Sequence, residues 1–174
     1  MAGTNGKQKT VRDMILSLGL IGLMAGVIYL FFIPHDEHTP DIKRVDYSVE
    51  LLTARRSATY PVAAPEGLPA TWKPTSVTFD GSQFDAWHLG FQDPTGQYVA
   101  VEQSTQQPAA FIDDASQGGK ESTATQNIGG QVWQRYTGGR YDALVLKAKG
   151  STTVVAGTAS FEQLTKMAQA LRTK

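Results

Sequence analysis

Residues 85–104, DAWHLGFQDPTGQYVAVEQS, decide the fold because they predict a β-hairpin whose register can be worked out. Asp93 and Pro94 suit the first two positions of a type I turn. Gly96 suits the left-handed position of the G1 bulge that follows such a turn. The turn therefore fixes which residues of the two flanking strands face each other.

The expected strands, Asp85–Gln92 and Gln97–Ser104, pair residues whose numbers add up to 190. His88 then faces Glu102 on one side of the hairpin. The other side carries the apolar residues, with Trp87 opposite Gln103, Leu89 opposite Val101 and Phe91 opposite Val99. The turn geometry and the apolar alternation are independent signals, and they predict the same register.

A helix is expected earlier in the chain, at Ser48–Ser57. Val45, Val49 and Leu52 have the spacing of one helix face, and Asp46 or Ser48 is available as the N-cap.

A proline-rich segment, residues 60–74, connects this helix to the sheet. Its four prolines each fix a backbone φ angle, so that stiffness orders the segment instead of a hydrogen-bond ladder. Leu68 and Trp72 are the apolar residues expected to attach it to the core. A short strand at Thr75–Asp80 then leads into the hairpin.

The chain after the hairpin predicts more sheet. Pro108–Ser116 is either a short helix or a loop. Glycines mark the turns between four further strands, expected at Thr123–Ile128, Gln131–Thr137, Tyr141–Ala148 and Ser151–Gly157. These strands predict an antiparallel meander with the core candidates Trp133, Leu144, Leu146 and Val154 or Val155.

The last segment predicts a helix that covers the sheet. Ser160 and Gln163 have the spacing of a capping box. The apolar stripe consists of Phe161, Leu164, Ala168 and Leu171. The predicted fold is therefore α+β, with one mostly antiparallel sheet of about seven strands, two or three helices, and the C-terminal helix packed on the sheet.

The run Met14–Ile33 is the second informative stretch. It is 20 residues long, contains no charged residue, and as a helix is about 30 Å long, the thickness of a bilayer's hydrocarbon core. We expect a single transmembrane helix at 14–33. The chain then divides into a cytoplasmic tail (1–13), this span, a hinge (34–47) and an extracytoplasmic α+β domain (48–174).

The flanks of this run predict its orientation. Lys7, Lys9 and Arg12 precede it, and Asp36 and Glu37 follow it. Because basic residues stay on the cytoplasmic side, we expect a single-pass protein of the cell membrane with its C-terminal domain outside. The bulky residues at the end of the run argue against cleavage as a signal peptide.

Gly19, Gly22 and Gly26 lie near one face of the predicted span. Small residues at this spacing allow two helices to approach closely in lipid, which predicts a weak homodimer. The alternative is that these glycines have no such role, since glycine is common in membrane spans.

Composition excludes several classes of function. The sequence has no cysteine, so disulfides, thiolate metal sites and a cysteine nucleophile are excluded. Residues 41–174 hold 13 basic and 13 acidic residues. A neutral domain lacks the basic surface that nucleic-acid binding requires, and we expect no nucleic-acid partner.

Catalytic signals are weak. His88 is the one histidine of the predicted domain, and Ser104, Asp85 and Glu102 are its possible neighbours. His88 and Glu102 are the candidates for hydrolytic chemistry; an ordinary cross-strand pair is the alternative. The motif His35–His38 could hold a metal only if helical, and Pro34 and Pro40 disfavour a helix there. We expect no cofactor and no metal.

Aromatic residues offer a different kind of site. Six of them could line an apolar groove between sheet and helix, or could fill the core: Trp72, Trp87, Tyr98, Trp133, Tyr136 and Tyr141. A groove of this kind would bind a lipid, a glycan or a peptide.

The chain contains several short motifs whose order and spacing match those of one protein family. They are Arg12-Asp13-Met14, Pro65-Glu66-Gly67-Leu68-Pro69 followed by Trp72, Trp87-His88-Leu89-Gly90, Glu102-Gln103-Ser104, Trp133, and Gly157-Thr158-Ala159-Ser160. In these motifs the chain resembles domain-of-unknown-function family 4245, whose members are small single-pass membrane proteins of high-GC Gram-positive bacteria. The resemblance implies a membrane-anchored extracytoplasmic domain and supplies no activity or site residues.

The sequence as a whole favours a membrane-anchored extracytoplasmic module that binds a ligand or an envelope protein and is not an enzyme. A cell-envelope hydrolase that uses His88 is the alternative. A binder of lipid, glycan or peptide in an aromatic groove is the other hypothesis.

Overall fold

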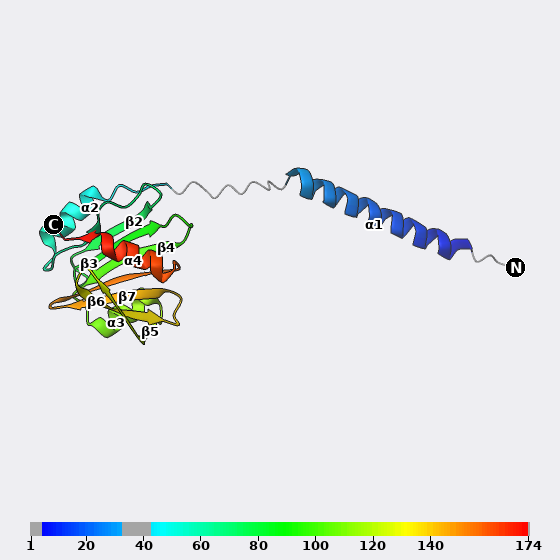
Figure 1. Ribbon diagram of the computed structural model, residues 1–174. Coiled ribbons are helices and arrows are strands. Elements are labelled where there is room, and N and C mark those ends of the chain that lie inside the picture. The colour runs from blue at the N-terminus through cyan, green and yellow to red at the C-terminus, as the bar shows by residue number, and fades with distance from the viewer. Residues whose placement is uncertain (1–4, 33–42, 174) are drawn as a thin grey trace. The chain divides into compact units, whose positions relative to one another are not determined.

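The computed structural model describes residues 5–32 and 43–173. The chain divides into two compact units, Met1–Asp41 and Ile42–Lys174. The first unit contains α1 (Asn5–Phe32). The second contains α2 (Ser48–Ser57), β1 (Ala64–Pro65), β2 (Lys73–Asp80), β3 (Ala86–Gln92), β4 (Tyr98–Ser104), α3 (Pro108–Ser116), β5 (Lys120–Ile128), β6 (Gln131–Thr137), β7 (Asp142–Ala148), β8 (Ser151–Gly157), α4 (Phe161–Ala170) and β9 (Leu171–Arg172) (Figure 1).

Helix α1 includes the apolar run up to Phe32. Large apolar side chains between Met14 and Ile28 are exposed along it. Within residues 5–32 and 43–173, no helix is found that is both long and apolar enough to cross a membrane. The transmembrane helix therefore stays a prediction. Ile33 and the motif His35–His38 lie outside the described residues.

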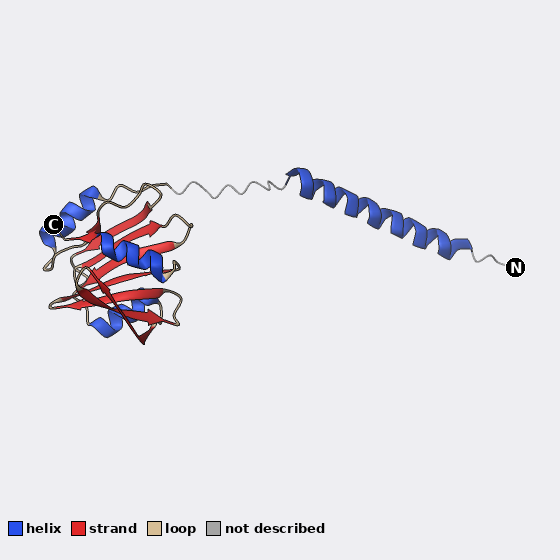
Figure 2. Ribbon diagram, viewed as in Figure 1, coloured by secondary structure: helices blue, strands red, loops and turns tan. Residues whose placement is uncertain are grey.

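Seven strands form one antiparallel sheet in the order β2-β3-β4-β8-β7-β6-β5 (Figure 2). The chain crosses by way of α3 from β4, inside the sheet, to β5 at its far edge. It then returns strand by strand until β8 pairs with β4. The predicted α+β class and the predicted strand number are confirmed.

The hairpin has the predicted register. His88 pairs with Glu102 and Leu89 with Val101. In the turn, Gly96 has a φ of 83° and donates to the carbonyl of Asp93. The side chain of Asp93 also accepts hydrogen bonds from the backbone of Thr95 and Gln97, both 2.8 Å long.

Helices cover both faces of the sheet (Figures 1 and 2). Val155 faces the larger core, which contains Leu164 of α4, Ala54 of α2 and the tryptophans. Its neighbour Val154 faces a second core under α3, built around Phe111. Neither of the two valines is exposed to solvent, because a strand with both faces covered has no solvent side.

Helix α2 has the predicted bounds, but Val49 and Leu52, whose spacing indicated it, are not the residues that pack on the core. Val49 and Leu52 are 70% and 56% exposed, whereas Ala54 is fully buried and Leu51 packs against the core. The helix is turned this way because Tyr47, just before it, packs edge-on against Phe91 with ring centroids 6.0 Å apart.

The predicted capping box is also wrong. Ser160 is the N-cap of α4 but makes no side-chain capping bond, and the side-chain oxygen of Gln163 is buried without a hydrogen-bond partner among the described residues. The apolar stripe does pack on the sheet. It also includes Met167, which is fully buried and was not among the residues of the predicted stripe.

The proline-rich segment has a short hydrogen-bond ladder after all. Its strand β1 pairs with the C-terminal strand β9, with Ala64 opposite Arg172. Trp72 is buried and Leu68 packs on the core, as predicted. Residues 43–47, assigned to the hinge from sequence, lie in the second unit, where Val45 donates a backbone hydrogen bond to Pro74.

Candidate functional site

His88 and Glu102 lie side by side on the sheet face that also carries α3. His88 Nδ1 is 3.4 Å from Glu102 Oε1, and the two side chains are 33% and 23% exposed. The pairing follows directly from the hairpin register. The other neighbours that sequence suggested lie elsewhere, since Ser104 bonds to the carbonyl of Phe84 and Asp85 bonds to Thr59.

Ser76 completes a row of three polar side chains that the sequence did not reveal. Its Oγ lies 3.1 Å from His88 Nε2, on the side opposite Glu102. A β-bulge between Pro74 and Ser76 shifts the pairing of β2 with β3, so that Ser76 lies opposite Gly90. The histidine is therefore held at both ring nitrogens.

Gly90 is the reason that these groups fit together. A Cβ built on Gly90 would overlap with Ser76 Oγ and would lie 3.2 Å from the hydroxyl of Tyr98. That hydroxyl is itself 3.4 Å from His88 Nε2. Two hydroxyls thus converge on one imidazole nitrogen above a glycine that leaves them room.

The row Ser76–His88–Glu102 has the order of a nucleophile, a base and an orienting carboxylate. The contacts of His88 with Ser76 and with Glu102 join neighbouring strands and lie on a partly solvent-exposed sheet face. In chemical terms the row is able to pass a proton from a serine hydroxyl to an imidazole.

Burial changes the acid–base behaviour of three tyrosines, of which Tyr98 is the one beside His88. Burial, and next the charge of Glu102, raise the pKa of Tyr98 to about 12. Burial and the hydrogen bond to Glu121 raise the pKa of Tyr136 to about 12. Tyr60 has a raised pKa for the same main reason, burial, and its hydroxyl donates to the backbone of Asp85 and Gln103.

We expect a loss of stability in alkali from these tyrosines. In the unfolded chain they ionise near pH 10, whereas folded Tyr98 and Tyr136 keep their protons to about pH 12. The stabilisation is complete below pH 10 and falls as the pH rises toward 12. Urea unfolding across this interval, with tyrosinate absorbance as a second signal, measures it. An equally steep loss in the variant Tyr98→Phe/Tyr136→Phe would contradict the assignment.

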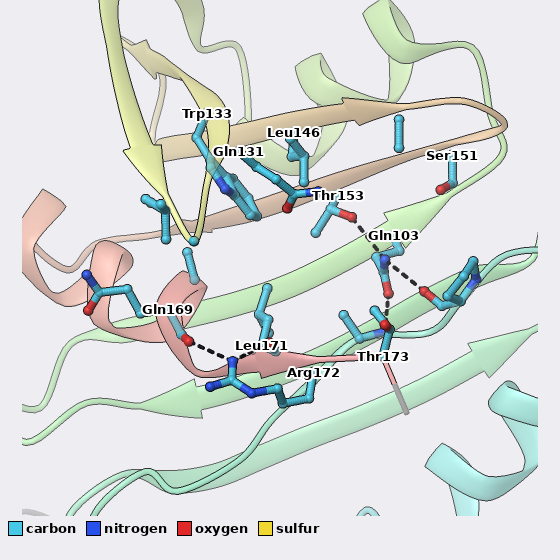
Figure 3. A pocket seen from close by; sticks show the side chains of 16 residues that line it. Gln103, Gln131, Trp133, Leu146, Ser151, Thr153, Gln169, Leu171, Arg172 and Thr173 are labelled. Atoms are coloured by element: carbon cyan, nitrogen blue, oxygen red, sulfur yellow. Dashed lines mark hydrogen bonds between the residues drawn. The ribbon is translucent and has the colours of Figure 1, made fainter.

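A hollow lies on the opposite face of the sheet, between its strands and the C-terminal end of the chain (Figure 3). Its volume is about 560 Å³, within the range of ligand-binding sites. We call it the C-terminal groove. Its apolar walls include Ile128, Trp133, Leu146 and Leu171, and Arg172 lies at its edge.

The base of the groove is formed by polar groups that bond to one another. Gln103, which is buried, accepts a hydrogen bond from the backbone of Ala63 and donates to Thr153 Oγ1 at 2.9 Å (Figure 3). Trp133 is buried in the wall, and its indole N–H has no partner among the described residues. The groove is thus mainly an apolar binding surface.

The six aromatic residues proposed as a groove have separate positions. Trp72, Trp87, Trp133 and Tyr136 are buried, so they belong mainly to the core. Only Trp133 lines the C-terminal groove. Tyr98 and Tyr141 pack against each other on the other face, with centroids 5.8 Å apart.

The predicted dimer face lies on α1. Gly19, Gly22 and Gly26 fall on one side of this helix, and a Cβ at each would have open space around it. Among the residues that the structure describes, no group of three or more histidines and carboxylates is arranged to hold a metal.

Together these features define an α+β domain with a ligand-sized groove, joined to a separate apolar helix. Comparison with protein families shows that residues 7–171 match the model of the family described as "Protein of unknown function (DUF4245)". The chain belongs to this family, as its motifs indicated. A search of curated proteins finds no match.

Proposed function

We propose that this protein is a membrane-anchored extracytoplasmic module that binds a ligand or an envelope partner and is not an enzyme. The C-terminal groove carries the proposal, because it is large enough for a ligand and is formed by segments from across the second unit. Among the residues that line the groove, no nucleophile is paired with a general base. Its polar side chains Gln103 and Thr153 are bonded to each other.

The anchor is supported by the sequence and by the exposure of α1. Met14–Ile33 lacks charge, and consecutive residues such as Met14, Ile15 and Leu16 are each more than 60% exposed. A helix that is apolar on all sides needs to be covered, and lipid is one environment that covers it. The basic residues before the run favour a cytoplasmic N-terminus.

Site-specific photocrosslinking tests the binding function. A photoreactive residue placed at Ala148, which lines the groove, should capture an envelope component in cells. The same residue placed at Ser82, on the exposed turn after β2, should not capture it. Equal capture at the two positions, or none at Ala148, would count against a binding role of the groove.

A hydrolase is the second candidate function, and Ser76 is the observation that favours it. In this function His88 removes the proton of Ser76 Oγ as the hydroxyl attacks an ester carbonyl, and Glu102 orients the imidazole. The imidazolium then gives the proton to the departing alcohol as the ester C–O bond breaks, and water, activated by His88, releases the acid from Ser76. Ser76→Ala and His88→Ala should then each lower the hydrolysis of a p-nitrophenyl ester at least about a hundredfold. Ser82→Ala serves as the control. Full function of His88→Ala in cells would eliminate this candidate.

A weak homodimer through α1 is the proposed oligomeric contact. Gly22 and Gly26 would let two spans approach closely in the bilayer. Replacing both with isoleucine should remove most of the signal of a reporter of span self-association. Leu20→Ile, away from the small-residue spacing, serves as the control. An unchanged signal in the glycine variant would rule the dimer out.

A further inference from the structure

The C-terminal groove has a single charge at its edge. Of the residues that line it, Arg172 alone carries a charge at neutral pH. Its guanidinium donates to the carbonyls of Gln169 and Leu171, at 2.9 and 2.7 Å, which fixes the charge at the end of α4 (Figure 3). In the described part of the chain, no carboxylate forms an ion pair with Arg172. A positive charge is therefore available to a ligand.

The base of the groove leaves few hydrogen bonds for a ligand. Gln103 uses its oxygen on Ala63 N and its amide on Thr153 and Pro61. A bound peptide needs partners for its backbone groups, and a bound sugar needs partners for its hydroxyls. At this base both kinds of ligand would lose hydrogen bonds to water and gain few in return. The polar groups left to them elsewhere in the lining are the indole N–H of Trp133 and the side chains of Gln131, Ser151, Gln169 and Thr173.

The walls, by contrast, suit an alkyl chain. Trp133, Leu146, Ile128 and Leu171 surround the hollow with apolar surface, and each methylene group transferred onto such a surface gains free energy. The volume of about 560 Å³ suits one drug-sized ligand or a single chain. An apolar body and an anionic head are the two properties that this surface recognises.

We propose that the C-terminal groove binds a single-chain amphiphile with an anionic head, of the fatty-acid or alkyl-phosphate class. The chain lies along Trp133, Leu146 and Leu171, and the head group pairs with Arg172. This inference rests on the proposed binding function and names its ligand class. A domain tethered beside a bilayer would be close to such molecules.

Titration of matched amphiphiles against residues 42–174 tests the proposal. This unit is suitable because its sheet, its three helices and both of its cores lie within it. The probes are dodecanoate, dodecyl phosphate, dodecanol and dodecyltrimethylammonium, each added below its micellar concentration. Calorimetry should give one site for the two anions, about tenfold weaker binding of dodecanol, and weaker binding still of the cation.

Two variants and a control locate the site. Arg172→Gln should weaken dodecanoate binding about tenfold while leaving dodecanol unchanged. Ala148→Trp, at the exposed rim, should block both anions. Arg56→Gln, on the exposed side of α2, should change neither, and circular dichroism confirms that each variant is folded. Tighter binding of dodecyl phosphate than of dodecanoate would indicate a phospholipid-derived ligand. Tighter binding of dodecanoate would indicate a fatty acid.

Three results would overturn the inference. They are equal binding of dodecanol and dodecanoate, unchanged binding in Arg172→Gln, and binding that survives Ala148→Trp. Failure of all four probes would also overturn it. Capture of a different envelope component by the photoreactive residue at Ala148 would then leave the proposed binding function standing, so the two failures are distinguishable.

Discussion

Gly157→Ala is expected to destabilise the second unit by about 3 kcal/mol or more. Gly157 ends β8 and pairs with Val99 of β4 on one side and with Asp142 of β7 on the other. An added Cβ would overlap with the carbonyl oxygen of Tyr98 and would lie 2.8 Å from its carbonyl carbon. These are backbone atoms of a central strand, so no side chain is able to rotate out of the way.

The same carbonyl accepts backbone hydrogen bonds from Thr158 and Ala159, and the displaced strand would weaken both. Urea unfolding of residues 42–174 measures the effect. The matched control is Gly81→Ala, because a Cβ on Gly81 meets only ordinary contacts at 3.6 Å or more. If Gly157→Ala were within about 1 kcal/mol of the wild type, this account of the β4–β8 junction would be incorrect.

Three arginines in the apolar run should release the protein from the membrane. The change Leu20→Arg/Leu23→Arg/Val27→Arg places each charge near the middle of the predicted span. Each arginine at such a depth costs about 2.5–3.5 kcal/mol of insertion free energy, so three cost roughly 8–10 kcal/mol. We expect the variant to move from the membrane pellet to the soluble fraction after cell lysis.

The matched control places three arginines at exposed apolar positions of the second unit, Val49, Leu52 and Val132. That variant should remain in the pellet. Since leucine and arginine have similar helix propensities, the change in α1 tests insertion instead of helix stability. Retention of the α1 variant in the pellet would contradict an anchor at Met14–Ile33.

Local signals predicted the hairpin well because two of them agreed. Asp93, Pro94 and Gly96 set the turn, and the alternation of Trp87, Leu89 and Phe91 set the inward face. For α2 the signals conflicted. Two sets of residues have helical spacing, and the face that packs is chosen by the contact of Tyr47 with Phe91, which is far away in sequence.

The candidate sites likewise divide into features set by local sequence and features set by contacts between distant segments. The pairing of His88 with Glu102 follows from the hairpin alone, so sequence predicted it. The approach of Ser76 depends on a bulge in β2 directly after Pro74, and a proline in a strand indicates an edge strand as readily as a bulge. The C-terminal groove depends on the pairing of β1 with β9, two-residue strands that are too short to show an alternating pattern.

The central claim is that a folded binding domain is held outside the membrane by Met14–Ile33. The absence of native cysteine allows a direct test with single cysteines. Lys149→Cys places a thiol on the exposed turn between β7 and β8, and Thr4→Cys places one in the N-terminal tail. A membrane-impermeant maleimide added to intact cells should label Lys149→Cys, and should label Thr4→Cys only after the cells are permeabilised. Labelling of Thr4→Cys but not of Lys149→Cys in intact cells would contradict the account.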